Sequence, residues 1–161
     1  MNEMSNTSPD NAMVLAAGLG TRMRPITDTK PKPLVQVFGK TLLDYGLDAL
    51  ESNGVKNAVV NVHYLAEQIE EHLSDRSNPA ISLSDETDAL LDSGGGIKKA
   101  LPKLGEDPFF LINADSFWLE GSTPNLKRLA GTFDPDKMDI LLMLSTMDSA
   151  IGYSGNGDFE M

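Results

Sequence analysis

The chain has 161 residues, a formal net charge of −11 and no cysteine, and 40% of its residues are hydrophobic. This length and composition fit one globular domain with a real core. The acidic balance disfavours nucleic acid and anionic membranes as partners. The lack of cysteine excludes disulfides, thiolate metal sites and a cysteine nucleophile, so carboxylates, histidines and backbone amides remain as the chemical repertoire.

Residues 1–11 are mostly polar and lack both the basic and the apolar regions of a secretory signal. No later segment reaches the ~20 consecutive apolar residues that a membrane-spanning helix needs. We therefore expect residues 1–11 to be a disordered tail and residues 12–161 to form a single domain. The protein is expected in the cytoplasm, without a membrane partner.

Apolar spacing predicts strands that alternate with helices along the chain. Short apolar runs favour strands at residues 12–17, 55–62, 81–83, 109–113 and 138–144. Apolar residues at helical spacing favour helices from Thr41 to Asn53, over residues 66–73 and 95–104, and after Pro124. Such alternation is typical of right-handed βαβ units, so we predict an α/β fold with a mainly parallel sheet and helices on both faces.

A basic, glycine-containing segment follows the first predicted strand. Residues 15–34 read LAAGLGTRMRPITDTKPKPL and contain four of the 13 basic residues within eleven positions. Glycines allow backbone N–H groups to approach phosphate oxygens, and Arg22 adds a planar charged donor. The segment is not a dinucleotide fingerprint, because Met23 stands where the third glycine is needed, and it lacks the Walker sequence. A turn with a solvated basic face is the alternative.

The whole segment resembles the signature of the sugar-1-phosphate nucleotidyltransferases: Leu-Ala-Ala-Gly-x-Gly-Thr-Arg, then Arg-Pro, then Lys-Pro-Lys-Pro-Leu. The resemblance continues through NVHYLAEQIEEHL, LLDSGGGIKKALPKLG, FFLINAD and GYSGNGDF. It is strongest for the bacterial N-acetylmuramate-1-phosphate uridylyltransferases, with mannose-1-phosphate guanylyltransferases next. The resemblance implies a Rossmann-like, GT-A-like three-layer fold, Mg²⁺ as cofactor, and a nucleoside triphosphate and a sugar 1-phosphate as partners.

The same resemblance assigns roles within the basic segment. It gives nucleotide binding to Ala17, Gly18, Gly20 and Thr21. It makes Arg22 the group that neutralises leaving pyrophosphate, and Lys32 the group that bridges the attacking and attacked phosphates. In-line attack of a phosphate oxygen on an α-phosphorus needs no protein nucleophile, only cations that reduce repulsion and hold the geometry. The residue chemistry therefore agrees with the assigned roles.

Later segments contribute further candidates. The resemblance gives the base contacts to Gly95, in a glycine-rich helix entrance, and to Glu86, seven residues before that helix. Asp115 follows a buried strand and matches the metal-binding aspartate, while Asn113 and Gly152 are assigned to the sugar pocket. A simple turn is the alternative for Gly95, and a helix-capping aspartate is the alternative for Asp115.

We predict Mg²⁺-dependent transfer of a nucleotidyl group from UTP to N-acetylmuramate 1-phosphate, in cell-wall recycling. A guanylyltransferase acting on mannose 1-phosphate is the first alternative, because a carboxylate such as that of Glu86 suits the two N–H donors of guanine better than the single donor of uracil. A non-catalytic domain that binds nucleotides or sugar phosphates is the second alternative.

The final segment, GYSGNGDFEM, ends without a turn or a cap. The resemblance implies several dozen further residues that complete the sugar pocket and bring a second metal-binding aspartate. We therefore expect a domain truncated at its C-terminus, the amino-terminal part of a longer enzyme. Such a chain would bind triphosphate weakly and would not turn over alone.

Overall fold

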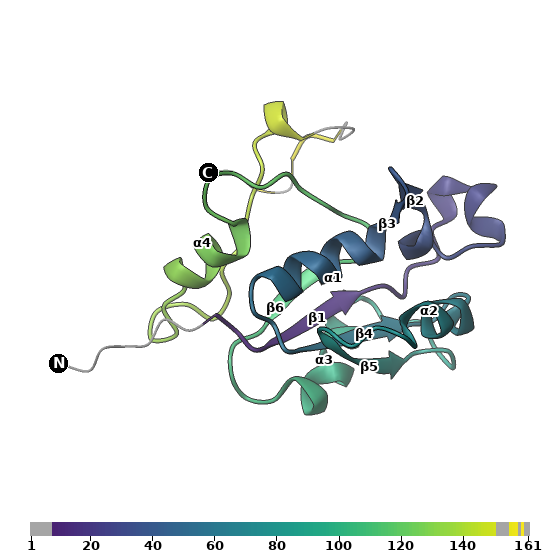
Figure 1. Cartoon of the computed structure of the whole chain (residues 1–161), viewed down its shortest axis with the longest axis horizontal. Coiled ribbons are helices and arrows are strands. Elements are labelled where there is room, and N and C mark those ends of the chain that lie inside the picture. The colour runs from purple at the N-terminus through teal and green to yellow at the C-terminus, as the bar shows by residue number, and fades with distance from the viewer. Residues whose placement is uncertain (1–7, 151–154, 158, 160–161) are drawn as a thin grey trace.

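The computed structural model describes residues 8–150, 155–157 and 159. A four-stranded sheet with the order β5-β4-β1-β6 forms its centre (Figure 1). Its strands are β1 (Asn11–Leu15), β4 (Asn57–Val62), β5 (Ala80–Asp85) and β6 (Phe110–Asn113). All neighbouring strands in this sheet pair in parallel, and in the central strand Ala12 lies in register with Ala58 on one side and Phe110 on the other. The mainly parallel α/β fold predicted from the sequence is confirmed.

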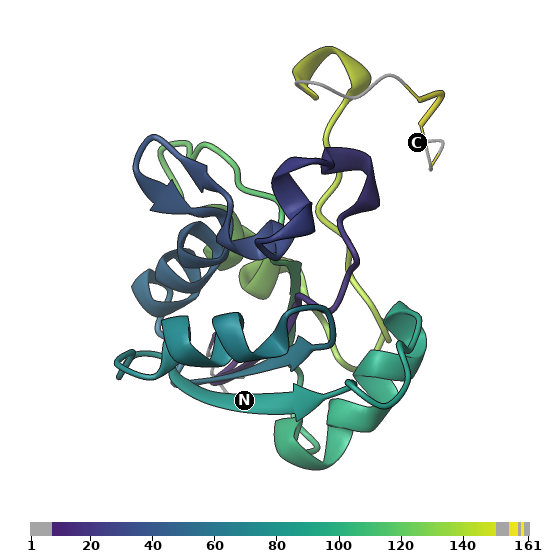
Figure 2. The ribbon, with the colours of Figure 1, turned by 90° about the vertical axis from the view of Figure 1, so that its right-hand side faces the viewer.

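Helices cover both faces of the sheet, which gives three layers (Figure 2). The α-helices of the described residues are α1 (Leu42–Ser52), α2 (Ala66–Leu73), α3 (Ser93–Leu104) and α4 (Asn125–Thr132). On one face, Val14 and Val60 share a buried core with residues of α1, α2 and α4. On the other face, Met13 and Val59 pack with Ala100 of α3. Neighbouring residues of each strand thus enter opposite cores, as the two-residue period of a strand requires.

A small hairpin that was not predicted precedes α1. Strands β2 (Gln36–Val37) and β3 (Lys40–Thr41) pair antiparallel before the helix starts. The turn between them uses left-handed backbone at Phe38 and Gly39, the conformation of a two-residue hairpin turn. The hydroxyl of Thr41 accepts a hydrogen bond from the backbone N–H of Asp44 at 3.0 Å, so Thr41 caps the start of α1.

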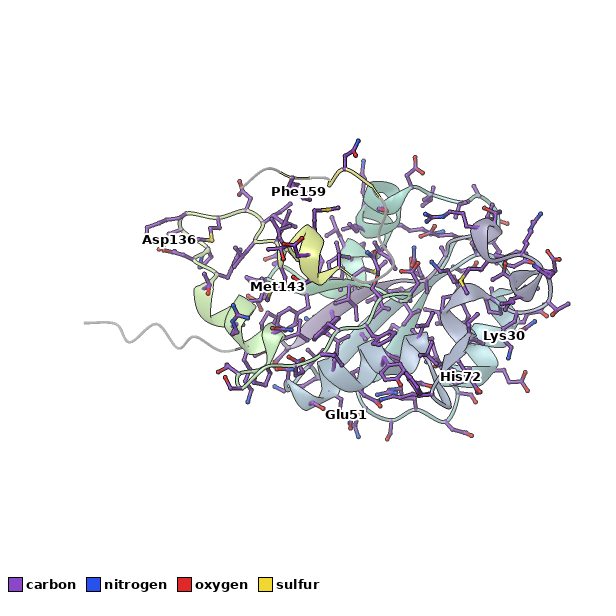
Figure 3. The ribbon with its side chains drawn as sticks, turned by 90° about the horizontal axis from the view of Figure 1, so that it is seen from above. Lys30, Glu51, His72, Asp136, Met143 and Phe159 are labelled. Carbon is purple, nitrogen blue, oxygen red and sulfur yellow. The ribbon has the colours of Figure 1, made fainter. Side chains whose placement is uncertain are left out.

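The prediction of a strand over residues 138–144 is wrong. The described structure has no strand there, and Ile140 and Leu142 are 77% and 52% exposed. Figure 3 shows Met143 in the same half of the view as Asp136 and Phe159, with His72 in the other half. A short apolar run is compatible with a strand. A strand also needs an adjacent strand to pair its backbone N–H and C=O groups, and an apolar pattern does not tell whether such a strand is present.

The strands of the central sheet all end at the same edge of the molecule (Figure 1). The chain after β1 forms short 3-10 turns at Thr21–Met23, Ile26–Asp28 and Lys32–Leu34 beside that edge. Ligand sites of open parallel sheets lie at this edge. Within the described residues, no helix combines the length and apolar character that crossing a membrane would demand.

Candidate functional site

A cleft of about 330 Å³ opens where β1 and β6 end. Most of its lining comes from the β1 loop, the name used here for residues 16–34. The lining residues are Gly18, Leu19, Gly20, Thr21, Arg22, Met23, Lys32, Leu90 and Asp115. The fold therefore gathers most of the predicted phosphate residues, with Lys32 and Asp115, around one space.

Lys32 and Asp115 meet at this cleft although 83 positions separate them in the sequence. The ammonium nitrogen of Lys32 lies 2.5 Å from Oδ2 of Asp115, and their side chains are 25% and 36% exposed. Two buried prolines, Pro31 and Pro33, flank the lysine and restrict its backbone. The backbone N–H of Ala114 donates to the carbonyl of Leu15 at 3.0 Å, which ties the start of the Asp115 turn to the end of β1.

Hydrogen bonds hold the β1 loop in one shape. Gly20 has a φ of 64°, in the left-handed region that favours glycine. Its carbonyl accepts a 2.8 Å hydrogen bond from the hydroxyl of Thr27, which is 1% exposed. The Tyr64 hydroxyl donates to the carbonyl of Thr27 at 2.9 Å, and the Gln68 amide donates to that of Thr29 at 3.0 Å. Side chains that follow β4 therefore fix the loop from outside.

The two arginines of the loop differ in their surroundings. Arg24 forms an ion pair with Asp28 at 3.3 Å. Arg22 lines the cleft and is exposed, and none of the described carboxylates lies within ion-pair distance of it. Arg22 is thus placed to interact with an anion in the cleft.

Several predicted site residues do not line this cleft. Ala17 is buried at the start of the loop, and Asn113 is the last residue of β6. Gly95 lies in the first turn of α3, where an added Cβ would lie 3.1 Å from Cβ of Leu91. Glu86 is 1% exposed, and its carboxylate points into the protein. Gly152 lies outside the described residues.

Leu19, Met23 and Leu90 line the cleft but were not predicted as site residues. Leu90 belongs to the α3 entrance, defined here as residues 86–96, and it is 43% exposed. An exposed leucine in an acidic loop carries no recognisable sequence signal. Its position shows that the α3 entrance faces the β1 loop across the cleft.

The first cleft offers few side-chain donors for a divalent cation. Among the residues that the structure describes, no group of three or more histidine, aspartate or glutamate side chains could hold a metal ion. Asp115 supplies one carboxylate at the edge of the cleft. Mg²⁺ commonly takes one or two protein carboxylates and completes its shell with phosphate oxygens and water, so this set fits a magnesium–nucleotide complex rather than free Mg²⁺.

A second cleft of about 230 Å³ lies over α1. The rings of Tyr45 and Phe117 stack there with centroids 4.9 Å apart, and the Lys40 ammonium lies 4.7 Å from the centre of the Tyr45 ring. Burial acts to raise the pKa of nearby Asp48, but hydrogen bonds from Lys40 and Arg76 lower that pKa overall. Trp118 contributes to the rim. None of the predicted site residues lines this second cleft.

The sequence is similar to known nucleotidyltransferases. Residues 11–153 match the family model described as "Nucleotidyl transferase". The chain is 48% identical over 155 residues to an N-acetylmuramate alpha-1-phosphate uridylyltransferase of Caulobacter vibrioides, covering 94% of this chain and 64% of that protein. It is 36% identical over 117 residues to a mannose-1-phosphate guanylyltransferase catalytic subunit beta of Drosophila pseudoobscura pseudoobscura, covering 68% and 32%.

Solved structures support the same fold. The inositol-1-phosphate CTP transferase from T. maritima superposes with a TM-score of 0.61 and 27% sequence identity. That similarity covers 68% of this chain and 45% of the other. The chain thus spans 32% to 64% of the length of these relatives.

Proposed function

Because the chain belongs to the nucleotidyl transferase family, we propose that its protein transfers a uridylyl group from UTP to N-acetylmuramate 1-phosphate. The observation that carries this proposal is the meeting of Lys32 and Asp115 beside a glycine-containing loop, at the edge of a parallel sheet. The 48% identity to a uridylyltransferase supports the choice of substrates. We further propose that the protein acts in the cytoplasm, in cell-wall recycling.

In the proposed reaction, a phosphate oxygen of the sugar 1-phosphate attacks the α-phosphorus of UTP. A new P–O bond forms, the bond from the α-phosphorus to the bridging oxygen breaks, and pyrophosphate leaves with the electron pair. Both reactants are anions, so the residues of this chain act mainly by reducing repulsion and fixing the line of attack.

Each predicted site residue that lines the cleft has a part in this proposal. Backbone N–H groups of Gly18, Gly20 and Thr21 bind the triphosphate, and Arg22 stabilises the charge that develops on pyrophosphate. Lys32 leaves its partner Asp115 and bridges the two reacting phosphates. Asp115 would then hold Mg²⁺, which when bound neutralises phosphate charge.

The preference for UTP over GTP rests on identity and on the position of Glu86. The chemical argument for guanine needs a carboxylate that accepts two hydrogen bonds from the base. Both carboxylate oxygens of Glu86 accept hydrogen bonds inside the protein, from the Asn61 amide at 2.9 Å and the Leu91 backbone N–H at 3.2 Å. With Glu86 engaged in this way, that argument for GTP loses its support.

A substrate matrix tests the proposal. The protein, expressed from its natural gene, is mixed with Mg²⁺, each of the four nucleoside triphosphates, and either N-acetylmuramate 1-phosphate or mannose 1-phosphate, and pyrophosphate is measured. We expect the highest rate with UTP and N-acetylmuramate 1-phosphate. A preference for GTP and mannose 1-phosphate would instead establish the guanylyltransferase. Nucleotide binding without pyrophosphate release from any pair would point to a regulatory binding domain.

A further inference from the structure

Three hydrogen bonds, two of them buried and one partly buried, form a series beneath the two loops that face each other across the cleft. The backbone N–H of Ala16, the first residue of the β1 loop, donates to Oδ1 of Asn61 at 2.7 Å. The side-chain amide of Asn61 donates in turn to Oε1 of Glu86 at 2.9 Å. The other carboxylate oxygen of Glu86 accepts from the backbone N–H of Leu91 at 3.2 Å. This series of hydrogen bonds therefore connects the β1 loop to the α3 entrance.

This connection is held rigidly on both sides. Asn61 is 3% exposed and Glu86 is 1% exposed, so neither side chain has water as an alternative partner. The backbone of Glu86 is also fixed: its N–H donates to the Val62 carbonyl at 2.8 Å, and its carbonyl lies 2.6 Å from Nδ1 of His63. The carboxylate thus has a defined position beneath the α3 entrance.

Gly96 gives a second, independent indication that α3 is fitted onto this pair. A Cβ at Gly96 would lie 2.8 Å from Oε1 of Glu86 and 3.0 Å from Nδ2 of Asn61. Real Cβ atoms essentially never approach a neighbour closer than 3.0 Å. The first turn of α3 can therefore lie over the two side chains only because this position has no side chain of its own.

We propose that Asn61 and Glu86 are positioning residues that set the separation of the β1 loop and the α3 entrance, and so align the phosphate and base subsites for one nucleotide. The inference rests on the proposed function, because it assigns the phosphates to the β1 loop and the base to the α3 entrance. It also replaces the predicted role of Glu86: the carboxylate acts through Asn61 and Leu91 instead of contacting the base.

The donor and acceptor roles of Asn61 and Glu86 can be exchanged by substitution, which gives a sharp test. Asn61→Asp places a second buried carboxylate beside that of Glu86. It also removes the amide that donates to Glu86. In the double variant Asn61→Asp with Glu86→Gln, the new glutamine amide can donate to the new aspartate. The remaining oxygens can still accept from Ala16 and Leu91, and the net charge of the pair is unchanged. Reversal thus preserves the connection while inverting the direction of one hydrogen bond.

The experiment measures dissociation constants of the protein, expressed from its natural gene, for UTP with Mg²⁺ and for inorganic tripolyphosphate with Mg²⁺. UTP spans both loops, whereas tripolyphosphate occupies only the phosphate subsite. We expect Asn61→Asp to weaken UTP binding at least tenfold and tripolyphosphate binding less than threefold, and the double variant to return UTP affinity to within threefold of the original. A loss of folded protein alone would weaken both ligands equally. Ile69→Val, a conservative change in the core of α2, serves as the control for lowered stability.

Three outcomes would overturn the inference. If the Asn61→Asp variant is folded and binds UTP as before, or is folded and binds both ligands more weakly by the same factor, the pair does not align two subsites. If the double variant binds UTP as poorly as Asn61→Asp, the hydrogen bond between the two side chains is not what matters. If the unmodified protein binds neither ligand, the proposed function fails as well, and this result separates that failure from the first two.

Discussion

The β1 loop and the α3 entrance face each other across one cleft, and both contain glycines, but they differ in what they contribute. The β1 loop brings Arg22 and Lys32 to the cleft, and Asp115 meets them there. The α3 entrance contains no lysine or arginine and brings the uncharged Leu90 to the cleft, while its polar contacts lie underneath. In the proposed function, one side supplies charge to the ligand, and the other supplies a fixed shape.

The glycines follow the same division. Gly20 is needed for its left-handed backbone, and it packs closely, since an added Cβ would lie 3.1 Å from Cβ of Lys32. Gly96 is needed for the space it leaves above Glu86. Gly94, two positions earlier, has open space around it. Glycine content alone therefore does not identify which position contacts a ligand.

The largest effect is expected on the charged side, at Asp115. Asp115→Asn keeps the size of the side chain but removes the charge that would hold Mg²⁺ and pair with Lys32. We expect the rate of pyrophosphate release to fall about 10²–10³-fold in the protein expressed from its natural gene, with the fold intact. Asp107→Asn, an exposed position before β6, is the matched control. An unchanged rate and an unchanged Mg²⁺ dependence in Asp115→Asn would remove this residue from the site.

Lys32→Ala should separate catalysis from binding. Because Lys32 is proposed to bridge the phosphates only as they approach, its loss should lower kcat about 10²-fold while weakening UTP binding only a few-fold. Lys98→Ala, which removes an exposed lysine of α3, should leave both quantities unchanged. A normal kcat with a raised Michaelis constant for UTP would contradict the bridging role.

The sequence predicted the charged side of the cleft better than the other side. Lys32 and Asp115 lie in recognisable sequence motifs. A parallel sheet brings the ends of neighbouring strands together, so the contact between these two residues follows from the topology. The position of Glu86 could not be predicted in this way, because burial of a carboxylate depends on partners such as Asn61 that lie in another strand. The absent strand at residues 138–144 has a similar cause, since its apolar pattern says nothing about a pairing partner.

Gly96→Ala should give the largest loss of stability among the glycine variants. Its Cβ would lie 2.8 Å from Oε1 of Glu86, so α3 must shift or the buried hydrogen bonds must break. We expect the free energy of unfolding to fall by about 2–3 kcal/mol in urea denaturation, in the range of other disrupted buried networks. A loss below about 0.5 kcal/mol would show that the helix accommodates a side chain over the pair.

Gly20→Ala should cost less, about 1–2 kcal/mol, because its main penalty is a left-handed backbone conformation. Gly54→Ala makes a matched control, since Gly54 has a φ of 87° and open space around it. The two variants share the backbone penalty, so any additional loss at Gly20 measures the crowding against Lys32 and Thr27. Equal losses of unfolding free energy in the two variants would show that the β1 loop accommodates a Cβ at Gly20 without crowding.

Gly94→Ala should have the smallest effect and the opposite sign. The position lies in the first turn of α3, has no neighbour within 4 Å of an added Cβ, and does not require left-handed backbone. Alanine there reduces the conformational freedom of the unfolded chain and favours the helix, so we expect a gain of about 0.4–1 kcal/mol in the free energy of unfolding. Two identical substitutions in one turn of helix would then change stability in opposite directions, because only one lies above the Asn61–Glu86 pair. If Gly94→Ala also lost 2 kcal/mol or more, the cost at Gly96 would reflect the helix entrance as a whole, and the buried pair would no longer explain it.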